Sequence, residues 1–271
     1  MQSGYRILFK NQESVKVERL EICALASGSN GNCYYVGNEK EAVLVDAGLS
    51  ARQLELRIAE RNLDPGKIKS ILITHEHSDH CRGVRVLSKR LKVPVYVTRK
   101  TYLAFRRAVK PMDVVWLEPG QPFSIGTLEI KAFRKSHDAA DACSFCISCG
   151  KIHVGVLTDI GVVDELVKNE FRRFRAVFLE SNYDEQMLKD GAYPSWLKQR
   201  VASDIGHLSN AQAVDLVNMA AGAELELILL SHISADNNTS ENILAAFDPL
   251  VGRYQIHLTS RWEPSEVFQI G

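Results

Sequence analysis

One stretch of this chain, residues 71–80 with the sequence ILITHEHSDH, constrains its fold more than any other. Three apolar residues and a threonine indicate the end of a buried strand. Three histidines and one aspartate follow within six positions: His75, His77, Asp79 and His80. Imidazole and carboxylate ligands suit zinc, manganese or iron, and the absence of thiolate among them argues against a closed structural zinc site. Because the chain has only eight histidines, we favour a metal site over a solvated polar loop.

Four more potential ligands follow apolar runs, where strands are expected to end. In chain order they are Asp46, His137, Asp159 and His232. Taken singly, a strand-end aspartate often caps a helix, and a lone histidine is more often a surface residue or a hydrogen-bonded core residue. Together with the histidine loop, these residues follow the order of the ligand pattern of the metallo-β-lactamase superfamily. The chain therefore resembles that superfamily.

The resemblance implies an α/β fold, the metallo-β-lactamase αββα sandwich, in which two mixed β-sheets pack face to face with helices outside. It also implies two divalent metal ions per chain, zinc or manganese with iron as a further option, that share a nucleophilic hydroxide. Asp46 would accept a hydrogen bond from the histidine loop and fix its orientation. The implied ligands are His75, His77 and His137 for one ion, Asp79, His80 and His232 for the other, and Asp159 as the bridge.

Finer motifs narrow the resemblance to the YycJ/WalJ-type branch of the superfamily, whose members act as exonucleases on DNA. These motifs are SGSNGN at 27–32, ESN at 180–182, GHLSN at 206–210 and SHISADNN at 231–238. The branch implies a dinuclear-metal-dependent phosphodiester hydrolase, with DNA as substrate. Within the motifs, substrate contacts are expected from Ser29, Asn32, Ser234 and Asn237.

His207 also resembles the general acid of the tRNA-processing and RNA-degrading relatives, where a glutamate orients the histidine. Glu180 holds the equivalent place, so His207, Glu180 and Asp79 are the expected catalytic residues. A histidine held by a carboxylate is suited to protonate the departing ribose oxygen. His207 as a polar pre-helix residue without substrate contact is the alternative.

Other functions remain open. The phosphonate-pathway cyclic phosphodiesterase shares the Ser-Gly-Ser-x-Gly-Asn start and is the main alternative, followed by another hydrolase of this fold. A metal-binding scaffold with a purely structural site is a third option. A Ser-His-Asp hydrolase is disfavoured because the chain lacks a G-x-S-x-G element.

Composition limits the binding partners and the cellular location that we expect for this chain. Lysine plus arginine and aspartate plus glutamate number 33 each, so net charge gives no general attraction to nucleic acid. Basic residues are nevertheless grouped locally, and they either line a path for the phosphates of a nucleic acid or are solvated helix faces without a binding role. They are Arg82, Arg85, Lys89, Arg90, Lys198 and Arg200. No signal peptide and no membrane-spanning apolar run is recognisable, so we expect a cytoplasmic protein with no membrane partner. The pattern leaves the oligomeric state open.

The six cysteines are expected to be reduced. Cys143, Cys146 and Cys149 recur at every third position of an expected strand. A zinc or cluster site there is conceivable, but buried free thiols are favoured.

Strands and helices alternate along the chain, which predicts one α/β unit over residues 20–271 after an N-terminal extension, 1–19, that is either a short strand or irregular. One helix is expected from Asp79 or His80 to Leu91, another over Lys100–Val109, and no element in the polar segment before Gly206. From Asp159 to His232 is 73 positions, assigned to two helices and two strands. We therefore expect no inserted second domain of the kind that large RNA-cleaving relatives carry.

Overall fold

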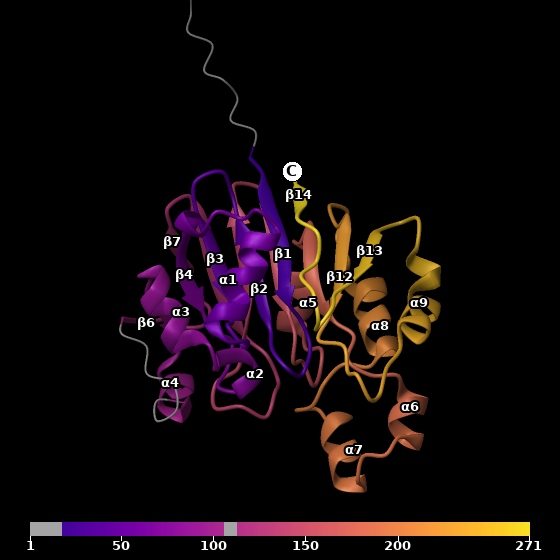
Figure 1. The fold of residues 1–271 in the computed structure, drawn as a ribbon. Helices are drawn as coiled ribbons and strands as arrows, with labels where there is room; N and C mark the ends of the chain where they lie inside the picture. Colours follow the sequence, from indigo (N-terminus) through magenta and orange to yellow (C-terminus); the bar gives the residue numbers. More distant parts are fainter. Residues whose placement is uncertain (1–17, 106–112) are drawn as a thin grey trace, which may run out of the picture.

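Two mixed β-sheets pack face to face, and helices cover the outer face of each (Figure 1). This computed structural model describes residues 18–105 and 113–271. The first sheet has the order β14–β1–β2–β3–β4–β5–β6. Its strands are β1 (Leu20–Ala26), β2 (Cys33–Gly37), β3 (Ala42–Val45), β4 (Ile68–Leu72), β5 (Val95–Val97), β6 (Val114–Trp116) and β14 (Phe268–Ile270).

The second sheet repeats the topology of the first, with the order β13–β12–β11–β10–β9–β8–β7. In each sheet, three antiparallel pairs at one side give way to three parallel pairs at the other. The strands are β7 (Phe123–Ile125), β8 (Leu128–Arg134), β9 (Cys143–Cys149), β10 (Ile152–Leu157), β11 (Ala176–Glu180), β12 (Leu227–Ser231) and β13 (Gln255–Leu258).

Helices bury one apolar face each against a sheet. Leu54 and Ile58 of α1 pack with Leu87 of α3 over the first sheet, and Phe171 of α5 packs with Leu216 of α8 over the second. Ser50 and Ser209 cap α1 and α8 through capping boxes, as their sequences predict. The helices are α1 (Ala51–Glu60), α2 (Ser78–Cys81), α3 (Val84–Leu91), α4 (Arg99–Phe105), α5 (Glu165–Phe171), α6 (Glu185–Asp190), α7 (Ser195–Val201), α8 (Asn210–Ala220) and α9 (Ser240–Phe247), with the short 3₁₀ turns η1 (Pro65–Lys67) and η2 (Asp248–Leu250).

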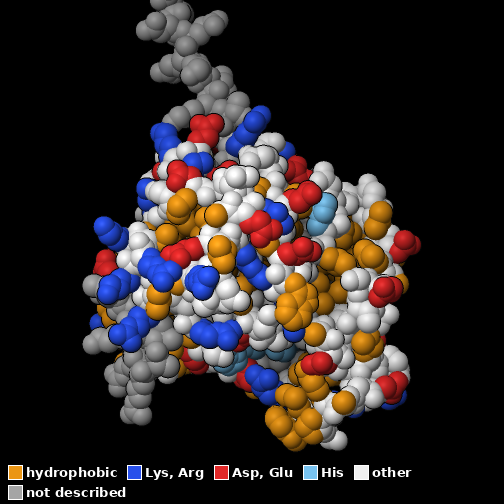
Figure 2. All heavy atoms as spheres, in the orientation of Figure 1, with side chains coloured by type: hydrophobic (Ala, Val, Ile, Leu, Met, Phe, Trp, Pro, Cys, Tyr) orange, Lys and Arg blue, Asp and Glu red, His pale blue; other side chains and the backbone are white. Residues whose placement is uncertain are grey.

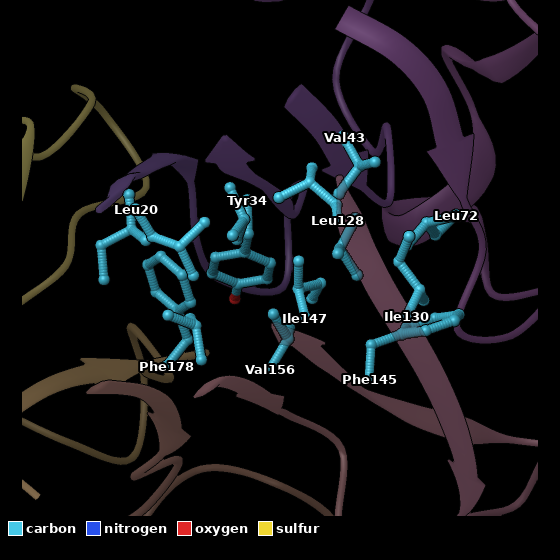
Figure 3. Close-up of a cluster of buried hydrophobic side chains, with 14 of the residues drawn as sticks. Leu20, Tyr34, Val43, Leu72, Leu128, Ile130, Phe145, Ile147, Val156 and Phe178 are labelled. Carbon is cyan, nitrogen blue, oxygen red and sulfur yellow. The ribbon is translucent and has the colours of Figure 1, made fainter. Parts of the chain in front are cut away.

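The central core lies between the two sheets and draws side chains from both (Figure 3). Tyr34 of β2 and Phe178 of β11 are fully buried there, with ring centroids 4.8 Å apart. Strand side chains alternate between this layer and the layer beneath the helices, which explains why most strands are apolar on both faces.

The ends of several strands meet at one edge of the sandwich, where the chain adopts unusual backbone angles. Asp46, Asp159 and His232 follow β3, β10 and β12 and have φ of 64°, 57° and 53°. This left-handed region costs a residue other than glycine roughly 1–3 kcal/mol and is found mainly where function requires it. Asp46 and Asp159 follow strands at equivalent places in the two sheets, where antiparallel pairing changes to parallel.

Several sequence-based element assignments were wrong in detail. The single helix expected to end at Leu91 is two helices, α2 and α3. Gly83 lies between them with its backbone against Leu49, where an added Cβ would lie 2.0 Å from the Leu49 carbonyl oxygen. The strand before the histidine loop runs from Ile68 to Leu72 and stops before Thr74.

The polar segment expected to lack structure carries α6 and α7, which project beyond the site edge of the sandwich (Figure 1). Four helices, not two, thus lie between Asp159 and His232. The short strands β7 and β14 were also missed. The expected helix over 100–109 begins as α4, and its end lies outside the described residues, as does most of the 1–19 extension.

We predict that Phe178→Ala lowers the free energy of unfolding by about 3–5 kcal/mol, because it empties a fully buried aromatic position between the sheets. Urea denaturation followed by circular dichroism measures this. Leu244→Ala, at a side chain that is 50% exposed, is the control and should change stability by no more than about 0.5 kcal/mol. Equal effects of the two substitutions would contradict this packing.

Candidate metal centre

The first group of potential ligands gathers His75, His77 and His137, with one ligand atom from each within 4.8 Å of the others. His77 Nδ1 and His137 Nε2 face each other at 3.3 Å. His75 is fully buried, and its Nε2 has no hydrogen-bond partner among the described residues. Burial, reinforced by His80, keeps the pKa of His75 well below its usual value, so this imidazole is neutral and ready to bind a metal.

The second group gathers Asp79, His80 and His232 within the same limit. Asp79 Oδ2 lies 3.4 Å from His80 Nε2 and 3.6 Å from His232 Nε2. Burial by itself would lower the pKa of His80, but Asp159, Asp79 and Asp46 raise it well above its usual value. These carboxylates thus favour a positive charge on His80 in the metal-free protein, a charge that a bound cation would supply instead.

Asp159 lies between the two groups. Its Oδ2 is 3.3 Å from His80 Nε2, and its Oδ1 is 3.9 Å from His137 Nε2. Although it is buried, Asp159 Oδ2 has no hydrogen-bond partner in the described structure. Burial raises the pKa of this carboxyl, yet His232, His80 and Lys135 outweigh burial and hold it well below its usual value.

Four of the imidazoles are each fixed by a hydrogen bond at Nδ1. Because the acceptors are carboxylate, carbonyl or hydroxyl oxygens, each Nδ1 carries a proton, and each Nε2 is the nitrogen that faces the site and can bind a metal when the ring is neutral. The hydroxyl of Thr74 is itself a donor to Asp46, so it can accept from its neighbour. The pairs are His75 with Thr74 Oγ1 at 2.9 Å, His80 with Asp46 Oδ2 at 2.7 Å, His137 with the Gly206 carbonyl at 3.0 Å, and His232 with Glu180 Oε1 at 3.0 Å.

Asp46 is fully buried and acts entirely as an acceptor. It accepts from the Thr74 amide at 2.9 Å, the Thr74 hydroxyl at 2.8 Å and His80 Nδ1 at 2.7 Å. This carboxylate therefore joins the end of β3 to the histidine loop after β4, and it reaches the site directly through His80 and, by way of the Thr74 hydroxyl, through His75. That is the arrangement expected for a residue that orients ligands.

The donor set fits divalent transition metals. The Nε2 atoms of His75 and His232 and the Oδ2 atom of Asp159 are buried without hydrogen-bond partners in the described residues. Leaving such groups unsatisfied costs about 1–3 kcal/mol each, so buried unpaired atoms that converge on one place imply a missing partner. Imidazole nitrogen with carboxylate oxygen suits zinc, manganese or iron.

Glu180 connects the metal groups to His207. Its Oε1 accepts from His207 Nδ1 at 2.9 Å and from His232 Nδ1 at 3.0 Å, while Oε2 accepts from the amides of Ile160 and Leu208. Burial raises the pKa of Glu180, but His207 and His232 outweigh burial and lower it to about 2. The carboxylate is therefore ionised and fully hydrogen-bonded. The sequence suggested its contact with His207 but not its contact with His232.

A pocket of about 230 Å³ opens over these groups. Of the four expected substrate contacts, Ser29, Ser234 and Asn237 line it. Asn32 is buried beside it, and its amide is 3.1 Å from His80 Nε2 and 3.4 Å from Asp79 Oδ2. The remaining lining residues are His77, Asp79, Asp159, Asn182, Tyr193, Leu197, Arg200, Val201, His207 and His232.

The basic side chains singled out from the sequence have different surroundings. Arg82 holds the site loop, donating to the carbonyls of Gly48 and Asn30, and Arg90 pairs with Glu55. Lys198 donates to a backbone carbonyl on α6. Arg200 pairs with Asp138 at 2.6 Å. Of these four side chains, Arg200 is the one that lines the pocket.

Lys135 and Tyr193 are near the site but were not recognised from the sequence. The Lys135 amine is fully buried, bonded to the Thr158 carbonyl and 3.9 Å from Asp159 Oδ2. Tyr193 lines the pocket and donates to Asp236 at 3.0 Å. Neither belongs to a motif, so only their position in the fold reveals them.

All six cysteines lie in described segments, and all are free thiols. Cys143 and Cys146 are buried in β9, and Cys149 is half-buried at its end. Burial raises the pKa of Cys146 to about 11, which makes it an unreactive thiol. Cys143 and Cys146 thus lie where buried thiols were expected, whereas Cys149 is only partly buried.

The fold and this edge site are those of a metallo-β-lactamase-type α/β sandwich. Residues 41–233 match the family described as the beta-lactamase superfamily domain. The chain belongs to this superfamily, as its motifs predicted.

Similar individual proteins are known. The chain is 36% identical over 225 residues to the exodeoxyribonuclease YycJ of Bacillus anthracis, covering 82% of this chain and 85% of that one. It is 35% identical over 222 residues to the exodeoxyribonuclease WalJ of Streptococcus pneumoniae, covering 80% and 82%. The crystal structure of the metallo-β-lactamase fold protein YhfI from Bacillus subtilis superposes with a TM-score of 0.71 at 16% identity, covering 93% and 99%. Within residues 18–105 and 113–271, every helix is too short or too polar to cross a membrane.

We predict that protein reconstituted with zinc or manganese binds two ions per chain and that His77→Ala removes at least one. The lost imidazole leaves an ion with too few ligands. Inductively coupled plasma mass spectrometry after desalting measures the stoichiometry. His153→Ala is the matched control, because His153 lies on β10, belongs to neither ligand group, and bonds through its ring to the Ser148 hydroxyl. Wild-type protein that retains no ion after reconstitution would refute the assignment.

Proposed function

We propose that this chain is a metal-dependent exodeoxyribonuclease that hydrolyses phosphodiester bonds at the ends of DNA. The observation that carries the proposal is the pair of ligand groups opening, together with His207, into one pocket. The similarity to two exodeoxyribonucleases along four-fifths of the chain supports DNA as the substrate.

The ligand assignment belongs to this proposal. His75, His77 and His137 would hold one divalent ion, Asp79, His80 and His232 would hold the second, and Asp159, which lies between the two groups, would serve both. Two such ions would lower the pKa of an attacking water and neutralise charge developing on the phosphate oxygens. Asp79 is 21% exposed and lines the pocket, so it is also placed to orient that water by accepting a hydrogen bond.

His207 acts as the general acid. Its Nδ1 is bonded to the ionised Glu180, so Nε2 is the nitrogen left to carry a proton toward substrate. The side chain is 13% exposed and lines the pocket, so a substrate bound in the pocket would place its departing ribose oxygen beside this ring. Glu180 stabilises the protonated ring and fixes its plane, as a carboxylate behind a catalytic imidazole does.

We predict that His207→Ala retains both ions while turnover on DNA falls by about a hundred- to ten-thousand-fold, the usual contribution of general acid catalysis. Because nitrophenolate departs without needing a proton, bis(p-nitrophenyl) phosphate should lose far less. Steady-state rates on both substrates, with metal content measured on the same samples, test this. His257→Ala, on the surface strand β13, is the control.

Two results would contradict the acid role. Equal losses on DNA and on the nitrophenyl ester would indicate substrate binding instead. Loss of an ion would make His207 a ligand, which its place in a group with Asp159, Glu180 and His232 allows geometrically.

A substrate panel tests the reaction itself. We predict that metal-loaded wild type releases nucleotides progressively from one end of end-labelled DNA, resolved on denaturing gels. RNA and a cyclic ribose phosphodiester are included in the panel. Exclusive activity on the cyclic ester would favour the phosphonate-pathway type of function and overturn the exonuclease proposal.

A further inference from the structure

A C-terminal strap, residues 260–267, crosses from β13 in the second sheet to β14 in the first, beside the ends of the strands that carry the site (Figure 1). The Ser27 amide donates to the Ser260 carbonyl at 3.2 Å, and the Ser265 amide donates to the Ala24 carbonyl at 2.9 Å. The strap thus begins against the SGSNGN loop, whose Ser29 lines the pocket.

Arg57 of α1 and Arg61, the residue that follows this helix, hold the strap in place. Arg57 donates to the carbonyls of Arg261 at 3.0 Å and Trp262 at 2.6 Å, and also to Leu25 at 2.7 Å. Arg61 donates to the carbonyls of Pro264 at 2.6 Å and Ser265 at 2.7 Å. Charge-assisted hydrogen bonds to successive carbonyls fix the backbone. The backbone of Arg261 and Trp262 is therefore held in place.

Trp262 is 78% exposed on this fixed strap, the most exposed of the large apolar side chains in the described structure. A single exposed apolar residue needs no explanation by itself. Here, however, the neighbouring residue connects it to the site. The Arg261 guanidinium lies 6.0 Å from the centre of the indole ring.

Arg261 lies at the rim of the pocket. An added Cβ on Gly28 (φ 144°) would be 3.4 Å from Arg261 Nε, so the guanidinium lies over the residue before Ser29. It is also close to Tyr193: burial and Asp236 raise the pKa of that pocket-lining phenol, and the Arg261 charge partly opposes them. Among described residues, the Arg261 guanidinium has neither an ion-pair nor a hydrogen-bond partner, which leaves its charge available for an anion.

The surface charge is consistent with a polyanion approaching here. Figure 2 shows Lys and Arg side chains gathered over the first-sheet side of this face, with acidic and apolar side chains on the other side. The helix α3 lies on that side in Figure 1, and its Arg85 and Lys89 are exposed. The chain is neutral as a whole, so this local concentration has to supply the attraction.

We propose that Arg261 and Trp262 form a subsite for single-stranded DNA at the rim of the pocket. Arg261 binds a backbone phosphate, and Trp262 stacks on an unpaired base near the scissile nucleotide. Bases inside a duplex already stack on both faces, so this subsite favours single-stranded ends. The subsite rests on the proposed exonuclease function and specifies its substrate.

The test measures binding of fluorescent oligodeoxynucleotides with a phosphorothioate backbone, which resist cleavage, to metal-loaded protein by anisotropy. Trp262→Ala should weaken binding by about 5- to 150-fold, the range for loss of one base–aromatic stack, whereas Trp262→Phe should retain most of it. Arg261→Gln should weaken binding and reduce the slope of log affinity against log salt by about one.

A matched control for Arg261 lies at the other end of β13. Arg253 is placed over the Tyr254 ring at 5.2 Å, the same pairing away from the site. Arg253→Gln should leave affinity and salt slope unchanged.

An abasic site moved along the oligonucleotide should weaken wild-type binding at one position near the bound end, and Trp262→Ala should be insensitive at that position.

The outcomes separate the two proposals. If wild type cleaves DNA but Trp262→Ala binds like wild type, or stays equally sensitive to every abasic site, the subsite is wrong and the exonuclease stands. If wild type binds single strands through Trp262 without cleaving any DNA, the subsite stands and the exonuclease fails. Wild type that neither binds nor cleaves DNA overturns both. Tighter binding to duplex than to single strands would also overturn the subsite.

Discussion

The hydrogen bond at Nδ1 of each buried site imidazole is the interaction on which the centre depends. An imidazole has two similar nitrogens, and a free ring can present either one. By committing Nδ1 to an oxygen acceptor, the fold leaves Nε2 of His75, His80, His137 and His232 as the nitrogen available to a metal. The acceptors come from both sheets, so the sandwich must be assembled before the ligand set exists.

These acceptors also explain why the site edge contains so many buried polar groups. Asp46, Asp159 and Glu180 are almost completely buried carboxylates, and an unpaired buried charge is costly. Asp46 and Glu180 satisfy their oxygens with protein donors, whereas Asp159 Oδ2 has none among described residues. The fold thus completes the surrounding shell by itself and leaves the centre to be completed by cations. Metal binding should accordingly stabilise the folded chain.

How much of this could be predicted depended on whether the signal was local. His75, His77 and His80 follow one strand, so their clustering is visible in the sequence itself. Glu180 was recognised through its motif, but its contact with His232 arises from parallel pairing of β11 and β12, which no spacing reveals. The helices α6 and α7 are short and polar, stabilised by a small cluster around Leu188 and Val201, and their pattern is too brief for periodicity to detect. Likewise, β14 is three residues long and exists because β1 offers an edge.

The two halves share a strand topology without sharing sequence. Comparing them shows how Asp46 and Asp159, which follow equivalent strands, come to have different roles at the site. Asp46 and Asp159 follow equivalent strands, and both occupy the left-handed backbone region that turns a side chain sharply at a strand end. In the first half, the Asp46 carboxylate accepts hydrogen bonds from the Thr74 hydroxyl and from His80 Nδ1. In the second half the next strand ends at Glu180, whose carboxylate accepts hydrogen bonds from His232 Nδ1 and His207 Nδ1, while Asp159 Oδ2 has no hydrogen-bond partner among the described residues. The same backbone geometry therefore gives a carboxylate that orients ligands after a strand of the first sheet, and a carboxylate that lies between the ligand groups after a strand of the second. The difference lies in which neighbouring groups donate hydrogen bonds to each carboxylate.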